Sequence, residues 1–153
     1  MNVLRTAGDL CSREVATALR STSLGDVARL LRQRHVGCVV VVDETPDGRV
    51  PVGLLTDRDI VTAVVAREVS PLLLRAGDVM TEDVVTLLDT ASIHEAVAMM
   101  RHRRVRRMPV VAAGGELVGL LAADDVLRLL AGDLVALGEA ASSQRQLEQI
   151  TRP

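Results

Sequence analysis

The residues best placed to do chemistry lie in one short run, Gly53-Leu54-Leu55-Thr56-Asp57-Arg58-Asp59, where an apolar segment gives way to a polar one. If a helix starts there, its first N–H groups favour a bound anion, and the glycine permits a close backbone approach. Thr56 offers a hydroxyl beside that anion, and Arg58 offers a charged donor. Asp59 can accept hydrogen bonds from two neighbouring hydroxyls, which is what a ribose presents. The run therefore suits a ribose phosphate.

The same run also has an ordinary structural interpretation. Thr56 and Asp57 are residue types that cap a helix N-terminus, and Asp59 complements the helix dipole. The run by itself leaves both interpretations open.

The chain consists of two copies of one unit. Several short segments recur in the same order, 69 positions apart before a central loop and 66 positions apart after it. The matched pairs are Ala7-Gly8-Asp9-Leu10 with Ala76-Gly77-Asp78-Val79, Ser23 with Ser92, Val36 with Val105, Gly53-Leu54-Leu55 with Gly119-Leu120-Leu121, and Asp59 with Asp125. A repeated order of this kind indicates an internal duplication.

Each copy is predicted to form a strand, a helix, two strands and a second helix. Apolar runs and turn signals predict strands at 14–19, 39–42 and 50–55, and at 83–88, 108–111 and 117–121. Ser23 and Ser92 stand at capping-box spacing from Asp26 and Glu95, each ahead of a helical apolar pattern. The second helices are expected to run to about Arg67 and Ala131. A unit of this size buries little surface alone, so we expect the copies to pack sheet to sheet around a pseudo-twofold axis with two equivalent clefts.

Composition narrows the function further. The 153 residues include no Phe, Tyr or Trp, so the core is aliphatic and a ring-shaped ligand has no aromatic side chain to stack on. All 18 basic residues are arginine, and the net charge of −2 does not favour a general nucleic-acid binder. No apolar run approaches the length of a membrane span, and no secretory signal is visible. We expect a cytoplasmic protein.

Together these motifs resemble a tandem CBS domain pair (a Bateman module) of the small stand-alone bacterial type. The resemblance covers roughly residues 7–132 and is most specific at Gly53…Thr56…Asp59, at Val105-Arg106-Arg107-Met108-Pro109 and at Gly119…Asp125. It implies an α/β fold of two β-α-β-β-α repeats, at 7–68 and 74–132, followed by a helical C-terminal tail at 133–153. It also implies a regulatory binder of AMP, ADP, ATP, S-adenosylmethionine, NAD(H) or a cyclic dinucleotide, often as a homodimer.

The resemblance assigns residues to each cleft. In the first cleft it places Thr56, Arg58 and Asp59 at the ribose phosphate, with Thr81, Val85 and Val105 as the adenine wall. Arg106 and Arg107 are placed near the pseudo-twofold axis, where they reach a phosphate of either cleft; the alternative is a solvated strand end.

In the second cleft the resemblance places Asp125 at the ribose, with Ser12, Ala16 and Val36 as the wall. The sequence departs from the family pattern here, because Ala122 stands where Thr56 stands in the first copy. Asp124 replaces Arg58 and brings a second carboxylate toward the expected phosphate. The first cleft is therefore the better candidate.

Other chemistry is less well supported by the residues. Cys11, Cys38 and the three histidines have no metal-ligand spacing, and the acids beside Asp59 and Asp125 lack the partners of a catalytic centre. We expect no enzyme, no metal and no obligatory cofactor. The tail after Asp133 is expected to pack on the body or on a second subunit. Two alternatives stay open: an interaction protein with vestigial clefts, and a metal- or nucleic-acid-binding stress protein.

Overall fold

The computed structural model describes the backbone of residues 5–151 and the side chains of residues 5–145. The first repeat contains α1 (Ala7–Leu10), β1 (Thr17–Leu19), α2 (Leu24–Arg34), β2 (Cys38–Thr45), β3 (Gly48–Thr56), α3 (Asp57–Ile60) and a π-helical turn, η1 (Val61–Val65). The second contains α4 (Ala76–Val79), β4 (Leu87–Leu88), α5 (Ile93–Arg103), β5 (Arg107–Val111), β6 (Leu117–Ala122) and α6 (Ala123–Thr151). Each repeat has the predicted order of elements.

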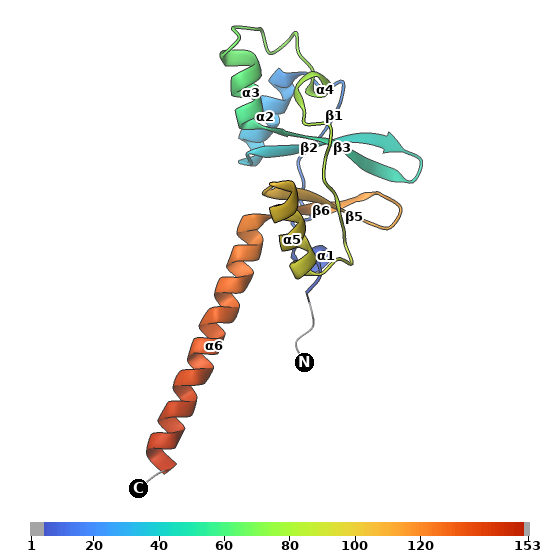
Figure 1. Ribbon diagram of the computed structural model, residues 1–153. Helices are drawn as coiled ribbons and strands as arrows, with labels where there is room; N and C mark the ends of the chain where they lie inside the picture. The colour runs from blue at the N-terminus through green and yellow to red at the C-terminus, as the bar shows by residue number, and fades with distance from the viewer. Residues whose placement is uncertain (1–4, 152–153) are drawn as a thin grey trace.

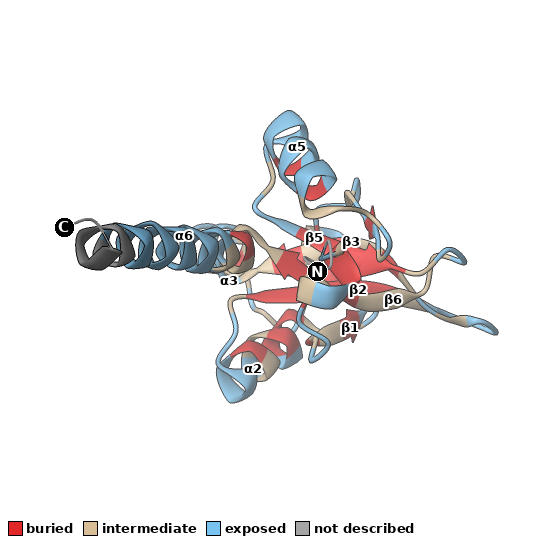
Figure 2. Cartoon of the chain, turned by 90° about the horizontal axis from the view of Figure 1, so that it is seen from below, coloured by how far each residue is buried: buried red, intermediate tan, exposed pale blue. Residues whose placement is uncertain are grey.

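Each repeat forms one three-stranded sheet, ordered β1-β2-β3 in the first and β4-β5-β6 in the second. In both sheets the first pair of strands is parallel and the second antiparallel, with a bulge at the equivalent positions Val41/Val42 and Val110/Val111. Ser23 and Ser92 accept hydrogen bonds from the backbone N–H groups of Asp26 and Glu95, so both predicted caps are confirmed. Figure 2 shows the buried strands at the centre, with α2 and α5 on opposite sides.

The first strand of each repeat is shorter than the sequence predicts. The expected strands at 14–19 and 83–88 are reduced to Thr17–Leu19 and Leu87–Leu88. The preceding residues pair across the repeats instead: Ser12 exchanges two backbone hydrogen bonds with Leu120, and Thr81 exchanges two with Leu54. These bonds fix the chain just ahead of each expected strand.

The short N-terminal helices cross over between the repeats. α1 packs on the second sheet, where Ala7 and Cys11 join the core around Met108 and Leu121. α4 packs on the first sheet, where Ala76 and Met80 belong to the other core (Figure 1). The unit that recurs in the sequence is therefore not the unit that packs, and neither core is complete without the other repeat.

Close packing between the repeats explains two glycines of the motif. A β-carbon on Gly53 would lie 2.4 Å from the sulfur of Met80, and one on Gly119 would lie 2.4 Å from the sulfur of Cys11. Both positions admit only hydrogen because a side chain of the other repeat fills the space. The close approach that the sequence suggests for a ligand is thus made by the protein itself.

The C-terminal tail is not a separate element. α6 continues without a break from the second repeat and projects away from the body (Figure 1). The expectation that the tail packs on the body is wrong, because the apolar side chains of Leu134, Val135 and Leu137 are 62–69% exposed. The second helix of the first repeat behaves differently, since it ends as the π-helical turn at Val65.

Candidate functional site: two equivalent clefts between the repeats

The Thr56 to Asp59 motif closes a capping box at the start of α3. One carboxylate oxygen of Asp59, Oδ2, accepts hydrogen bonds from the backbone N–H and the hydroxyl of Thr56, both at 2.8 Å. The backbone N–H of Asp59 donates to the Thr56 hydroxyl at 3.3 Å. The ordinary capping interpretation of this motif is therefore confirmed. Within the described part of the chain, no hydrogen bond reaches the other oxygen, Oδ1.

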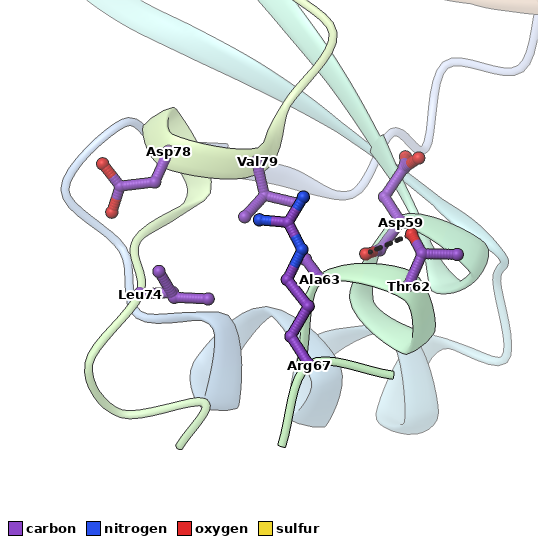
Figure 3. A pocket seen from close by; sticks show the side chains of 7 residues that line it. All are labelled: Asp59, Thr62, Ala63, Arg67, Leu74, Asp78 and Val79. Atoms are coloured by element: carbon purple, nitrogen blue, oxygen red, sulfur yellow. Dashed lines mark hydrogen bonds between the residues drawn. The ribbon is translucent and has the colours of Figure 1, made fainter. Parts of the chain in front are cut away.

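A cavity of about 280 Å³ opens beside Asp59 where the two repeats meet. Its walls are formed by α3, η1 and Arg67 just after η1, and by α4 with Leu74 shortly before it. The lining residues, drawn in Figure 3, are Asp59, Thr62, Ala63, Arg67, Leu74, Asp78 and Val79. The cavity thus joins Asp59 of one repeat to the first helix of the other, whereas the wall expected for the first cleft, Thr81, Val85 and Val105, does not line it.

The charges in this first cleft are two carboxylates and one guanidinium. Asp78 caps α4 through a hydrogen bond from the backbone N–H of Arg75 at 2.8 Å. Arg67 rises between Asp59 and Asp78 in Figure 3. The hydroxyl of Thr62 donates to backbone carbonyls, including that of Asp59 at 3.1 Å, and leaves the Asp59 carboxylate free. The cleft offers a hydroxyl-bearing ligand an open acceptor in a half-buried position.

A second cavity of about 300 Å³ occupies the equivalent place in the other half of the molecule. It is lined by Arg5, Leu10, Asp125, Arg128 and Leu129. The repeat offsets map Asp125, Arg128 and Leu129 onto lining residues of the first cleft, and they map Leu10 onto Val79. The two equivalent clefts predicted from the duplication are therefore present.

The carboxylate of the second cleft is fully engaged by the chain. Oδ2 of Asp125 accepts a hydrogen bond from the backbone N–H of Ala122 at 3.2 Å. Oδ1 pairs with the guanidinium of Arg128 at 3.1 Å. Asp124, the residue that we expected to oppose a phosphate, pairs with Arg106 at 3.4 Å.

Of the arginines predicted for the phosphate, Arg107 begins β5 and Arg106 directly precedes it. Burial raises the pKa of the neighbouring Cys38 thiol to about 11, while the charge of Arg107 acts in the opposite direction. The carboxylates of Asp59 and Asp57 add to the increase. Arg107 from one repeat and Asp59 from the other are thus close enough to influence the same buried thiol.

The remaining predicted residues lie around the clefts but do not line the two cavities. Thr81 is exposed and pairs with Leu54, and Arg58 is exposed on the first turn of α3. The predicted walls divide between the cores: Val85 and Val105 pack against the second and Ala16 belongs to the first, whereas Val36 is 41% exposed. Their assignment to an adenine wall stays a prediction.

Sequence reasoning missed most of the cavity lining. Asp78 and Val79 were visible as part of a recurring Ala-Gly-Asp-Leu signature, which marks the repeat but carries no sign of a ligand. Thr62, Ala63 and Arg67 follow the motif at helical spacing and therefore share its helix face. That spacing is the signal that identifies them once the cleft is known.

Among the side chains that the structure describes, no group of three or more His, Cys, Asp and Glu residues is close enough together to hold a metal ion. No helix in residues 5–151 is long and apolar enough to span a bilayer.

Comparison with known proteins gives the family. The model of the CBS domain matches this chain twice, at residues 7–66 and 76–132. The chain belongs to the CBS-domain family. The CBS pair also resembles an uncharacterized protein of Methanopyrus kandleri, with 31% identity over 124 residues. That match takes in 81% of this chain and 62% of the relative, so the CBS pair spans about three fifths of that relative's length.

Hypoxic response protein 1 of Mycobacterium tuberculosis is 30% identical over 127 residues, covering 83% of the CBS pair and 86% of that protein. Its crystal structure, which holds two coordinated zinc ions, is similar with a TM-score of 0.69 over 80% of this chain and 97% of that one. The cytosolic domain of the Mg²⁺ channel MgtE in complex with ATP shares 26% identity with a TM-score of 0.69, over 82% of this chain and 48% of that one.

Proposed function

We propose that this CBS pair is a regulatory binding module for an adenosine-containing small molecule, held in the cleft beside Asp59. The observation that carries the proposal is the open Oδ1 of Asp59 in a cavity of about 280 Å³ shared by both repeats. A carboxylate in the lining of a cavity can accept a ribose hydroxyl when one oxygen is fixed by its own helix and no hydrogen bond from the described part of the chain reaches the other. The relationship to a CBS-domain structure that holds ATP supports an adenine nucleotide as the ligand class.

Regulation follows from where the cleft lies. Its two walls come from different repeats. Each repeat is packed against the other through the crossed helices α1 and α4. A ligand that bridges these walls with different affinity for two arrangements of the repeats shifts their equilibrium. We therefore propose that the output is a change in repeat packing, read by a partner protein or by the oligomeric state.

Association is proposed to use α6. Leu127, Leu130, Leu134 and Leu137 are spaced by three, four and three residues, and all four are 46–69% exposed. Apolar residues with this spacing form the contact stripe, or seam, between the two helices of a coiled coil. The flanking positions carry only one charge, that of Asp133. We propose that a second copy of the chain covers this seam.

The test is scanning calorimetry with AMP, ADP, ATP, S-adenosylmethionine, NADH and cyclic di-AMP in turn. Calorimetry suits a protein without aromatic side chains, and a ligand at about 100 times its Kd adds roughly 2.7 kcal/mol to the free energy of unfolding. Asp59→Asn is the informative variant, since its amide oxygen still caps α3 while its NH₂ group faces the cavity as a donor. We expect this variant to lose the ligand shift and Asp125→Asn to retain most of it.

Asp47→Asn is the matched control, because Asp47 is exposed at the tip of the hairpin between β2 and β3. A ligand shift that survives Asp59→Asn but disappears in Asp125→Asn contradicts the assignment of the clefts. If none of the six compounds raises the melting temperature, the module is an interaction protein with vestigial clefts.

A further inference from the structure

The two clefts differ at one position that faces the acidic residue. The first cleft has Thr62 three residues after Asp59, and the second has Arg128 three residues after Asp125. Thr62 turns its hydroxyl to the backbone carbonyls of Arg58 and Asp59, both at 3.1 Å. Arg128 instead places its guanidinium 3.1 Å from Oδ1 of Asp125.

This difference decides whether an acceptor is left for a ligand. Asp59, which lines the first cavity, uses one carboxylate oxygen for its helix cap, and no hydrogen bond from the described part of the chain reaches the other. Asp125 uses one oxygen for the Ala122 N–H and the other for Arg128. A vicinal diol that enters the second cleft must displace Arg128 before it can donate a hydrogen bond to Oδ1 of Asp125.

The net charges of the residues that line the two clefts also differ. The first cleft contains Asp59, Asp78 and Arg67, with an excess of one negative charge. The second contains Asp125, Arg5 and Arg128, with an excess of one positive charge. The repeats thus present equivalent cavities with opposite electrostatic character, so they favour ligands of different charge.

We infer that the residue at this position, Thr62 or Arg128, determines which cleft accepts an uncharged ribose diol, and that Arg128 acts as an internal occupant of the second site. The inference rests on the proposed function and goes further, because it explains why one cleft binds the diol more tightly than the other. The Arg128 side chain is 77% exposed, and an exposed ion pair is a modest barrier. We therefore expect Arg128 to weaken diol binding by about fivefold, which corresponds to roughly 1 kcal/mol.

Reciprocal exchange tests this inference. Adenosine is titrated into the full chain and followed by NMR, with the backbone amides of Asp59 and Asp125 reporting the Kd of each cleft separately. The variants are Arg128→Thr and Thr62→Arg. Arg145→Thr is the control, because it makes the same change at an exposed position farther along α6. 2′,3′-Dideoxyadenosine, which lacks the diol, is the control ligand.

We expect adenosine to bind the first cleft more tightly in the unaltered chain, and Arg128→Thr to strengthen the second cleft about fivefold. Thr62→Arg should weaken the first cleft, and dideoxyadenosine should show neither effect. If adenosine binds both clefts of the unaltered chain with the same Kd, or if neither exchange variant changes a Kd, this inference is wrong while the proposed function stands. Tighter AMP binding at Asp125 that is lost in Arg128→Thr also overturns it, since Arg128 is then a phosphate ligand. If adenosine, AMP and ATP shift neither amide in any variant, the proposed function fails as well.

Discussion

Replacing Gly119 by alanine should destabilise the protein strongly, because the two repeats meet at this residue. The added β-carbon would lie 2.4 Å from Sγ of Cys11 and 2.7 Å from the backbone carbonyl oxygen of Ser12. That carbonyl accepts a hydrogen bond from the N–H of Leu120 at 2.9 Å, and the N–H of Ser12 donates to the carbonyl of Leu120 at 3.0 Å. A backbone oxygen cannot rotate away, so the strand and the loop must separate.

The magnitude follows from these contacts. Overpacking in a core costs about 1–3 kcal/mol, and each hydrogen bond that is lengthened costs about 1 kcal/mol. We expect Gly119→Ala to lower the free energy of unfolding by about 3 kcal/mol. For a chain of this size, about 2–4 °C is lost per kcal/mol, so the melting temperature should fall by roughly 6–12 °C in scanning calorimetry.

Two matched variants check the reasoning. Gly53→Ala should be milder, because its closest contacts are atoms of the flexible Met80 side chain. Gly132→Ala lies in α6 with open space around the new methyl group, so it should raise stability by about 1 kcal/mol. If Gly119→Ala melts within about 2 °C of the unaltered protein, the repeats are not held together at this junction and the explanation of the glycine is wrong.

Three further predictions concern titration, reactivity and assembly. Hydrogen bonds from the Ser92 N–H and hydroxyl lower the pKa of Glu95, so its stabilising contribution should be present above about pH 4.5 and be lost as the pH falls. The melting temperatures of Glu95→Gln and the unaltered chain should therefore differ at pH 7 and converge at pH 3; a constant difference contradicts this. With its pKa raised to about 11, only about one Cys38 thiol in a thousand is ionised at pH 8, so mass spectrometry should show slow alkylation by iodoacetamide until the chain unfolds. Equal rates in the native and unfolded chain would show that the thiol is not protected. Leu134→Glu should convert the dimer proposed above to a monomer in analytical ultracentrifugation, and an unchanged mass excludes α6 as its interface.

Much of this protein can be predicted from sequence because its signals are local. The caps at Ser23 and Ser92 join residues three positions apart, whose hydrogen bonds form within one turn. The duplication can be recognised because the same short segments recur in the same order along the chain. The capping role of Thr56 and Asp59 is equally local, and the sequence offered it beside the ligand interpretation. Of the residues predicted for the first site, Asp59 alone lines its cavity.

Only the tertiary structure determines which segments of one repeat pack against the other repeat. The signatures at Ala7 and Ala76 are nearly identical, so the sequence does not tell which sheet each will cover; packing assigns each to the opposite core. The same exchange brings Asp78 into the cavity that Asp59 lines. Asp59 and Asp78 come together only in the completed backbone, so composition and spacing predicted two clefts but not the residues that line them. The pair of Arg128 with Asp125, in contrast, joins residues three positions apart on one helix.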